Sequence, residues 1–118
     1  MTQHLSLHTR TTPSGAVIEL SGELDFHSAD RVRAQLAGLE LPPGGQLVLD
    51  LGGITFCDST GITVLIAARN HALATDAGIA LAAVPGPVSR IFRMVGLDQV
   101  FASHATVQAA VAAWRPTG

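Results

Sequence analysis

The fold is decided by residues 46–73, which read QLVLDLGGITFCDSTGITVLIAARNHAL. The stretch opens with the apolar run Leu47-Val48-Leu49 and then reaches a Gly52-Gly53 pair. A short apolar run bounded by glycines is typical of a buried strand. From residue 62 to about residue 74, apolar residues recur every three or four positions, which is typical of an amphipathic helix. The stretch therefore predicts a strand over 46–51, a loop over 52–59 and a helix.

Asp58 and Ser59 stand where that helix is expected to begin. Both side chains can accept hydrogen bonds from the first unpaired backbone N–H groups of a helix. A helix N-terminus also favours anionic groups, so the fold would tolerate a phosphate on Ser59. Such a phosphate would add about 1.5–2 negative charges beside Asp58 and change a surface without unfolding the domain. These residues alone favour plain capping for Ser59 and leave phosphorylation open.

The composition indicates one folded domain, expected to span residues 1–118 with 1–3 and 115–118 frayed. Hydrophobic residues make up 47% of the chain, and this length buries about two thirds of its unfolded surface. The seven basic residues are scattered arginines, so we expect no nucleic-acid partner. A lone cysteine, Cys57, excludes an internal disulfide and is read as an inert buried thiol. With no leader and no apolar run of about 18 residues, we expect a cytoplasmic protein without a membrane partner.

The whole sequence predicts an α/β domain with a mixed sheet of about four to five strands and about four helices. The expected strands are residues 4–10, 16–21, 46–51, 79–84 and 100–101, and the expected helices are residues 28–39, 62–74, 88–95 and 106–114. Ser28 is the expected N-cap of the first helix. The strands at 46–51 and 79–84 flank a helix, so they form a parallel pair with a right-handed crossover. Helix spacing predicts that the second and third helices bury Ile62, Leu65, Ile66, Leu73, Ile91 and Val95.

Two loops, at residues 22–27 and 52–59, are expected to leave the sheet at the carboxyl ends of strands. Functional sites of open α/β sheets gather at such strand ends. If the two strands are parallel and adjacent, Asp25 and Asp58 lie on one rim of the sheet.

Other chemistries fit these residues less well. A hydrolase using Ser59 lacks the glycine two positions earlier that a nucleophile elbow needs. A triad also needs a histidine, and the best candidate is His27, because it follows the other loop at the rim. A phosphorylated Asp58 lacks a surrounding cluster of acids for a metal. His4 and His8 share one strand face, but two histidines near a terminus are more often solvated. We therefore expect no catalytic residue, no metal site and no cofactor.

Two motifs resemble those of the STAS domains of bacterial anti-sigma factor antagonists. Asp58-Ser59-Thr60-Gly61 follows a strand ending in Leu49-Asp50-Leu51, and Gly22-Glu23-Leu24-Asp25 follows the second strand. Residues 90–98, RIFRMVGLD, are similar to the third-helix segment of these domains. The resemblance covers essentially the whole chain. One departure is Thr63, where the family often has glycine after Gly-Leu; here the pair is Ile62-Thr63, and this departure bears on the identity of the partner.

The resemblance implies a regulator without catalytic activity that is switched at Ser59. In that family an anti-sigma factor binds the unmodified protein, acts as an ATP-dependent serine kinase on this serine and thereby ejects it. A serine phosphatase then resets the switch. An alternative is a STAS-type scaffold or transport-complex subunit that binds a fixed partner without phosphorylation. The residues expected to bind the partner are Asp25, Asp58, Thr60, Gly61, Ile62 and Thr63.

Overall fold

A computed structural model describes residues 5–115 of the chain and shows one five-stranded sheet with four α-helices in that range. The strands are β1 (Leu5–Thr12), β2 (Gly15–Leu24), β3 (Gln46–Cys57), β4 (Gly78–Ala82) and β5 (Ala102–His104). The helices are α1 (Ala29–Ala37), α2 (Ser59–Ala74), α3 (Gly86–Val95) and α4 (Val107–Ala113), with a 3₁₀ turn at Leu97–Gln99. The predicted α/β class and mixed sheet are confirmed. The fraying predicted at the two ends falls outside the described residues, apart from Arg115.

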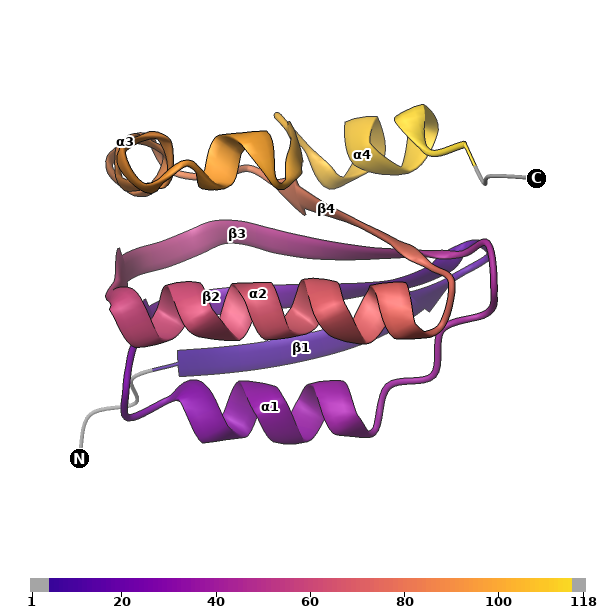
Figure 1. Ribbon diagram of the computed structural model, residues 1–118, viewed down its shortest axis with the longest axis horizontal. Coiled ribbons are helices and arrows are strands. Elements are labelled where there is room, and N and C mark those ends of the chain that lie inside the picture. The colour runs from indigo at the N-terminus through magenta and orange to yellow at the C-terminus, as the bar shows by residue number, and fades with distance from the viewer. Residues whose placement is uncertain (1–4, 116–118) are drawn as a thin grey trace.

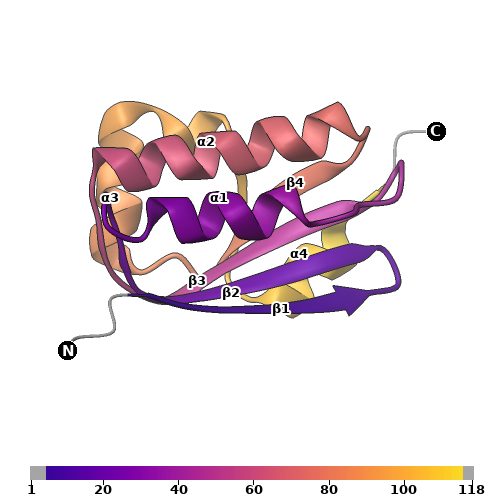
Figure 2. The same ribbon diagram turned by 90° about the horizontal axis from the view of Figure 1, so that it is seen from below.

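The strands follow one another across the sheet in chain order. β1 is antiparallel to β2, and each later strand is parallel to the one before it. Each parallel connection passes over a face of the sheet, because parallel neighbours cannot be joined by a tight turn. Helices α1 and α2 lie on one face and α4 lies on the other (Figures 1 and 2). The predicted hairpin and the predicted β3–β4 crossover are both present.

Alternating side chains of the central strand form two separate cores. Leu47, Leu49 and Leu51 pack on the side of α1 and α2, whereas Val48 packs against residues of α4. All four are at most 2% exposed. Burial of each such side chain contributes about 1.5–3 kcal/mol, so the sheet is held from both faces. This explains why the run is continuously apolar where a half-buried strand would alternate.

Strands β2 and β3 extend further than the sequence predicts, to Leu24 and Cys57. The glycines that suggested strand ends lie inside the ladder instead. Register shifts occur between Glu19 and Ser21 and again after Gly22. A Cβ atom on Gly53 would lie 2.3 Å from Ser21 Oγ, so glycine is needed there for close strand packing. The expected loops therefore shrink to a short turn before α1 and to Asp58 alone before α2.

The buried face of α2 differs from the prediction. Leu65 is buried and Ile62 half-buried as expected, but Ile66 and Leu73 are 37% and 49% exposed. The remaining buried positions are held by smaller side chains, among them Ala68. Apolar residues occur around the whole of this helix, so its sequence does not define one stripe.

The buried face of α3 was predicted wrongly. Val88 and Phe92 are 4% exposed, whereas Ile91 and Val95 are 36% and 56% exposed. Both pairs have the same four-residue spacing, so periodicity cannot distinguish the two stripes. Gly96 ends the helix in a left-handed conformation with φ of 82°, as a C-terminal glycine commonly does.

The C-terminal third of the chain shifts two further predictions. The last strand lies at 102–104 and not at 100–101, because Val100 and Phe101 close the 3₁₀ turn and Phe101 is buried in the core. Gly78 opens β4 and does not cap α2. A Cβ atom on Gly78 would lie 2.2 Å from the Trp114 ring, whose Nε1 donates to the Gly44 carbonyl at 3.1 Å. This glycine is therefore needed for the close approach of the chain end.

Candidate functional site

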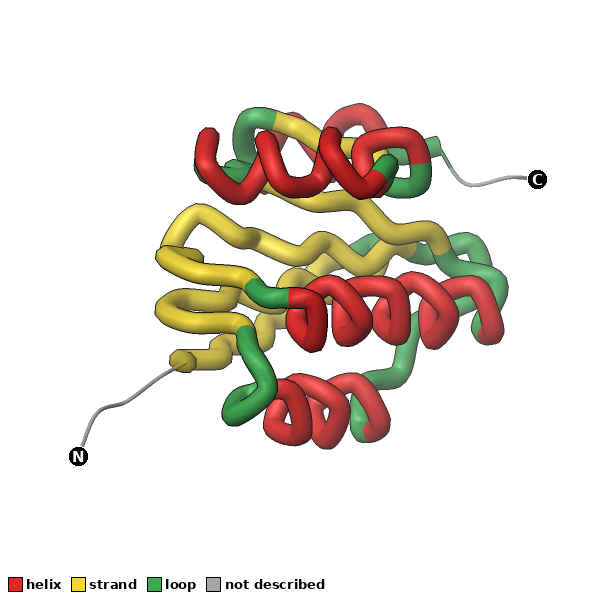
Figure 3. Tube along the Cα trace, turned by 60° about the vertical axis from the view of Figure 1, so that its left-hand side comes forward, coloured by secondary structure: helices red, strands yellow, loops and turns green. Residues whose placement is uncertain are grey.

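Strands β2 and β3 end on the same side of the sheet, where the connections to α1 and α2 leave it (Figure 3). Leu24 pairs with Cys57 at the ends of the parallel strands β2 and β3, so both connections leave the sheet side by side. The Asp58 N–H donates to the Leu24 carbonyl at 3.2 Å, and the Phe26 N–H donates to Asp58 Oδ2 at 3.3 Å. The structure thus places Asp25 and Asp58 on one rim, as the topology predicts. We call residues 25–28 and 58–63 the serine rim.

Asp58, and not Ser59, caps helix α2. The Asp58 backbone is extended, and its Oδ1 accepts from the Gly61 N–H at 2.9 Å. Ser59 is the first residue of the helix and is exposed. Among residues 5–115 its hydroxyl has no hydrogen-bond partner. The interpretation of Ser59 as a plain cap is therefore wrong, because the preceding aspartate already fills that position.

Replacing Asp58 by alanine is expected to lower the free energy of unfolding by about 1–2 kcal/mol, since the change removes both the helix cap and the bond to Phe26. Asparagine keeps an acceptor for the Gly61 N–H, so Asp58→Asn should lose clearly less. Urea denaturation of the two variants and the wild type measures the difference. Equal losses for alanine and asparagine would show that Asp58 stabilises the protein by some means other than capping.

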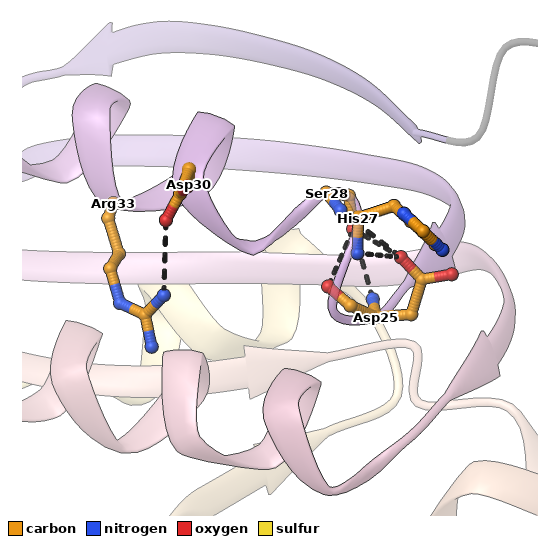
Figure 4. Close-up of polar contacts among 5 residues, drawn as sticks. All are labelled: Asp25, His27, Ser28, Asp30 and Arg33. Carbon is orange, nitrogen blue, oxygen red and sulfur yellow. Dashed lines mark hydrogen bonds and ion pairs between the residues drawn. The ribbon is translucent and has the colours of Figure 1, made fainter.

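Asp25 shapes the turn between β2 and α1 (Figure 4). Its Oδ1 accepts from the N–H groups of His27 and Ser28 at 3.0 and 3.1 Å, and the side chain is only 8% exposed. Ser28 stands at the predicted N-cap of α1 but makes no capping bond, because its hydroxyl donates to the Glu23 carbonyl at 2.8 Å. Asp25 therefore holds the rim in place from below and offers little surface to a partner.

The rim surrounds an open depression of about 560 Å³ in which Ser59 lies. Thr63 is exposed there, and its hydroxyl donates to the Ser59 carbonyl at 3.0 Å. Thr60 is half-buried, whereas Gly61 is buried and Ile62 packs partly against the core. The predicted contact residues thus divide into exposed and supporting members. The depression is lined by Phe26, His27, Ala29, Asp30, Arg33, Ser59, Thr60 and Thr63.

Sequence reasoning missed two aromatic residues at this edge. Phe26 is 73% exposed and Phe56 is 49% exposed, although large aromatic side chains are usually buried. The Phe26 ring packs edge-on against the His27 ring, with centroids 5.8 Å apart. Of the two, Phe26 lines the depression and is a candidate contact for a partner. Their positions in the sequence could have indicated that they lie near the rim, because Phe26 directly follows Asp25 and Phe56 lies two residues before Asp58.

The geometry gives no support to the alternative chemistries. A serine nucleophile needs a base within hydrogen-bond reach, and the Ser59 hydroxyl has none in the described part of the chain. Between residues 5 and 115 no group of three potential metal ligands occurs, while His4 of the His4–His8 pair lies outside that range. Burial, with a smaller contribution from the charge of Asp58, raises the pKa of the Cys57 thiol to about 11. Cys57 is therefore a neutral thiol near pH 7, in line with an inert role.

No helix within the described range is long and apolar enough to cross a membrane.

Comparison with known proteins places the chain among relatives of the same fold. The model of the family described as "Mlab, STAS domain" matches residues 7–108. The chain is 34% identical over 95 residues to the anti-sigma F factor antagonist of Lysinibacillus sphaericus, covering 79% of this chain and 78% of that protein. It is 32% identical over 85 residues to that of Paenibacillus polymyxa, covering 71% and 73%.

A solved structure agrees with the sequence relatives. The crystal structure of an anti-sigma factor antagonist from Mycobacterium paratuberculosis superposes with a TM-score of 0.76 at 26% identity, covering 94% of each chain. The names of these relatives describe a regulatory role, antagonism of an anti-sigma factor, which agrees with the predicted non-enzymatic regulator. The chain therefore belongs to the STAS domain family, as its two motifs predict.

Proposed function

We propose that this protein is an anti-sigma factor antagonist that binds an anti-sigma factor through the serine rim and is released when Ser59 is phosphorylated. One observation carries the proposal: the Ser59 hydroxyl is exposed, makes no hydrogen bond among the described residues and lies in an open depression at the start of α2. A kinase can reach such a hydroxyl without unfolding any part of the domain. The names of the relatives supply the class of partner.

The same geometry explains why phosphorylation would leave the fold intact. A phosphate on the first helical residue lies at the positive end of the helix dipole, a favourable interaction of about 0.3–1 kcal/mol. Because the Ser59 hydroxyl has no partner within residues 5–115, its modification breaks no hydrogen bond there. Asp58 remains free to cap the helix, since its own contacts are to Gly61 and Phe26.

In this proposal the chain and its partners have separate roles. The anti-sigma factor acts as the serine kinase and supplies ATP, its metal and the catalytic base. This chain supplies the acceptor hydroxyl and the docking surface, with Phe26 as an exposed apolar contact beside it. A serine phosphatase removes the phosphate and restores binding. The protein needs no cofactor of its own in this scheme.

Incubation with the cognate anti-sigma kinase and ATP should add one phosphate to the wild-type protein and none to Ser59→Ala, as measured by intact mass. Thr11→Ala is the matched control, because it removes an exposed hydroxyl at the opposite end of the sheet and should still gain one phosphate. A phosphate on Ser59→Ala, or its loss from Thr11→Ala, would refute the assignment of the site.

The alternative is a scaffold or transport-complex subunit that binds a fixed partner without phosphorylation. The exposed Ser59 hydroxyl argues against it, because a permanent interface has no need of an accessible acceptor. Capture of partners from extract separates the two functions. Recovery of a membrane transporter, with Ser59 unmodified in the same cells, would replace the proposed switch by this scaffold role.

A further inference from the structure

We infer that Arg33 is the cation that receives the phosphate once Ser59 is phosphorylated, an inference that rests on the function proposed above. Arg33 comes from α1 and Ser59 from α2, and both line the same depression. The two helices lie side by side on one face of the sheet (Figures 1 and 2). In Figure 4 the Arg33 side chain extends from α1 toward the neighbouring helix.

The present partner of Arg33 holds it weakly. Its Nη1 lies 3.5 Å from Asp30 Oδ1, and the two side chains are 44% and 99% exposed. Exposed pairs of this kind contribute little to stability, because water screens them and long side chains lose entropy. A phosphate carries about 1.5–2 negative charges and three acceptor oxygens, and guanidinium binds such a group bidentately. Arg33 therefore exchanges Asp30 for the phosphate.

Arg33 is the arginine that lines the depression, and the other charged groups near Ser59 are mainly carboxylates. Asp30 faces the depression from α1, and Asp58 stands beside Ser59 at the N-cap of α2. Apart from Arg33, the lining contains no arginine, and His27 is its other basic side chain. Without Arg33 the phosphate would stand mainly among carboxylates. Pairing with Arg33 keeps the phosphate doubly charged near neutral pH, because a neighbouring cation favours the ionised form.

The test uses protein in which phosphoserine is installed at position 59 during translation, so that no kinase is needed. Titration of its ³¹P resonance gives the second pKa of the phosphate. We expect Arg33→Gln to raise that pKa by about half a unit. Arg33→Lys should stay closer to the wild type, because it keeps a positive charge. Arg10→Gln is the matched control, since it removes the same charge from β1 and Arg10 does not line the depression.

His27 also lines the depression and is its second basic side chain, so the comparison is repeated with His27→Gln in every variant. An unchanged phosphate pKa in Arg33→Gln, or an equal rise in Arg10→Gln, would overturn the inference. A second readout needs no substitution of Arg33: in the phosphorylated protein its Nε–H resonance should titrate with the midpoint of the phosphate. If that resonance does not respond, Arg33 does not hold the phosphate. Failure of the kinase experiment above would instead count against the proposed function, because the phosphate here is installed independently.

Discussion

Replacing Gly61 by alanine is expected to destabilise the domain by about 2–3 kcal/mol and to displace the turn that presents Ser59. A Cβ atom at this buried position would lie 2.3 Å from the Leu24 carbonyl oxygen and 2.9 Å from Cys57 Sγ. The Leu24 carbonyl belongs to the backbone at the end of a sheet strand, so it cannot swing aside as a flexible side chain would. An exposed glycine in a helix would instead gain up to about 1 kcal/mol on change to alanine, so the sign of the effect is informative.

Gly86→Ala is the matched control for this substitution. Gly86 opens helix α3, and a Cβ atom there would meet no heavy atom within 4 Å. We expect this variant to be as stable as the wild type or slightly more stable in urea denaturation. If Gly61→Ala unfolded at the same urea concentration as the wild type, the close approach of α2 to the strand ends would be refuted.

Phosphorylation of Ser59 is expected to weaken binding to the anti-sigma factor by about a hundredfold or more. The phosphate adds about 1.5–2 negative charges beside Asp58, on the surface that we propose for docking. Like charges brought together at an interface cost several kcal/mol, and each 1.4 kcal/mol is about tenfold in affinity. The favourable interaction with the helix dipole is present in the free and the bound domain alike, so it does not offset the loss of affinity.

Ser59→Asp is expected to weaken binding to the anti-sigma factor as well, but by less than phosphorylation does. A carboxylate adds about one negative charge, whereas a phosphate adds up to two. Isothermal titration with the anti-sigma factor should show a clear loss of affinity, while the melting temperature stays near that of the wild type. Thr11→Asp adds the same charge at an exposed position of β1 that pairs with Ala16, at the opposite end of the sheet. An equal loss of affinity in Thr11→Asp would mean that net charge, and not the serine rim, controls binding.

Much of the fold followed from the sequence because burial and turn chemistry left strong local signals. The run Leu47-Val48-Leu49 has the pattern of a strand covered on both faces, and the structure covers it with α1 and α2 on one side and α4 on the other. The crossover from β3 to β4 followed from chain order alone. The joint placement of Asp25 and Asp58 followed from that topology, since parallel neighbours end at the same edge.

The errors have a common physical origin in contacts between distant residues. Gly53 and Gly78 looked like chain breakers, yet each is required by the close approach of Ser21 or Trp114 from elsewhere in the chain. The buried stripe of α3 had two equivalent candidates, and only the packing of Phe92 on the core decides between them. Such contacts leave no local pattern that could be read in advance.

At the site, too, features set by neighbouring residues could be predicted from the sequence, and features set by contacts between distant residues could not. The sequence singled out Asp58 and Ser59 but did not assign their separate roles, because aspartate and serine cap helices almost equally well. The bond from the Phe26 N–H to Asp58 Oδ2 joins residues 32 positions apart and gives the aspartate a second function that serine lacks. The sequence alone did not connect Arg33 with the site, because its position in the depression depends on the packing of α1 beside α2.

The central claim, that phosphate on Ser59 changes docking and spares the fold, is tested most directly on one preparation carrying phosphoserine at position 59. Its free energy of unfolding in urea and its affinity for the anti-sigma factor are measured beside those of the unmodified protein. We expect the unfolding free energies to agree within about 1 kcal/mol and the affinities to differ by about a hundredfold or more. Equal affinities, or a loss of affinity accompanied by unfolding of the domain, would contradict the account.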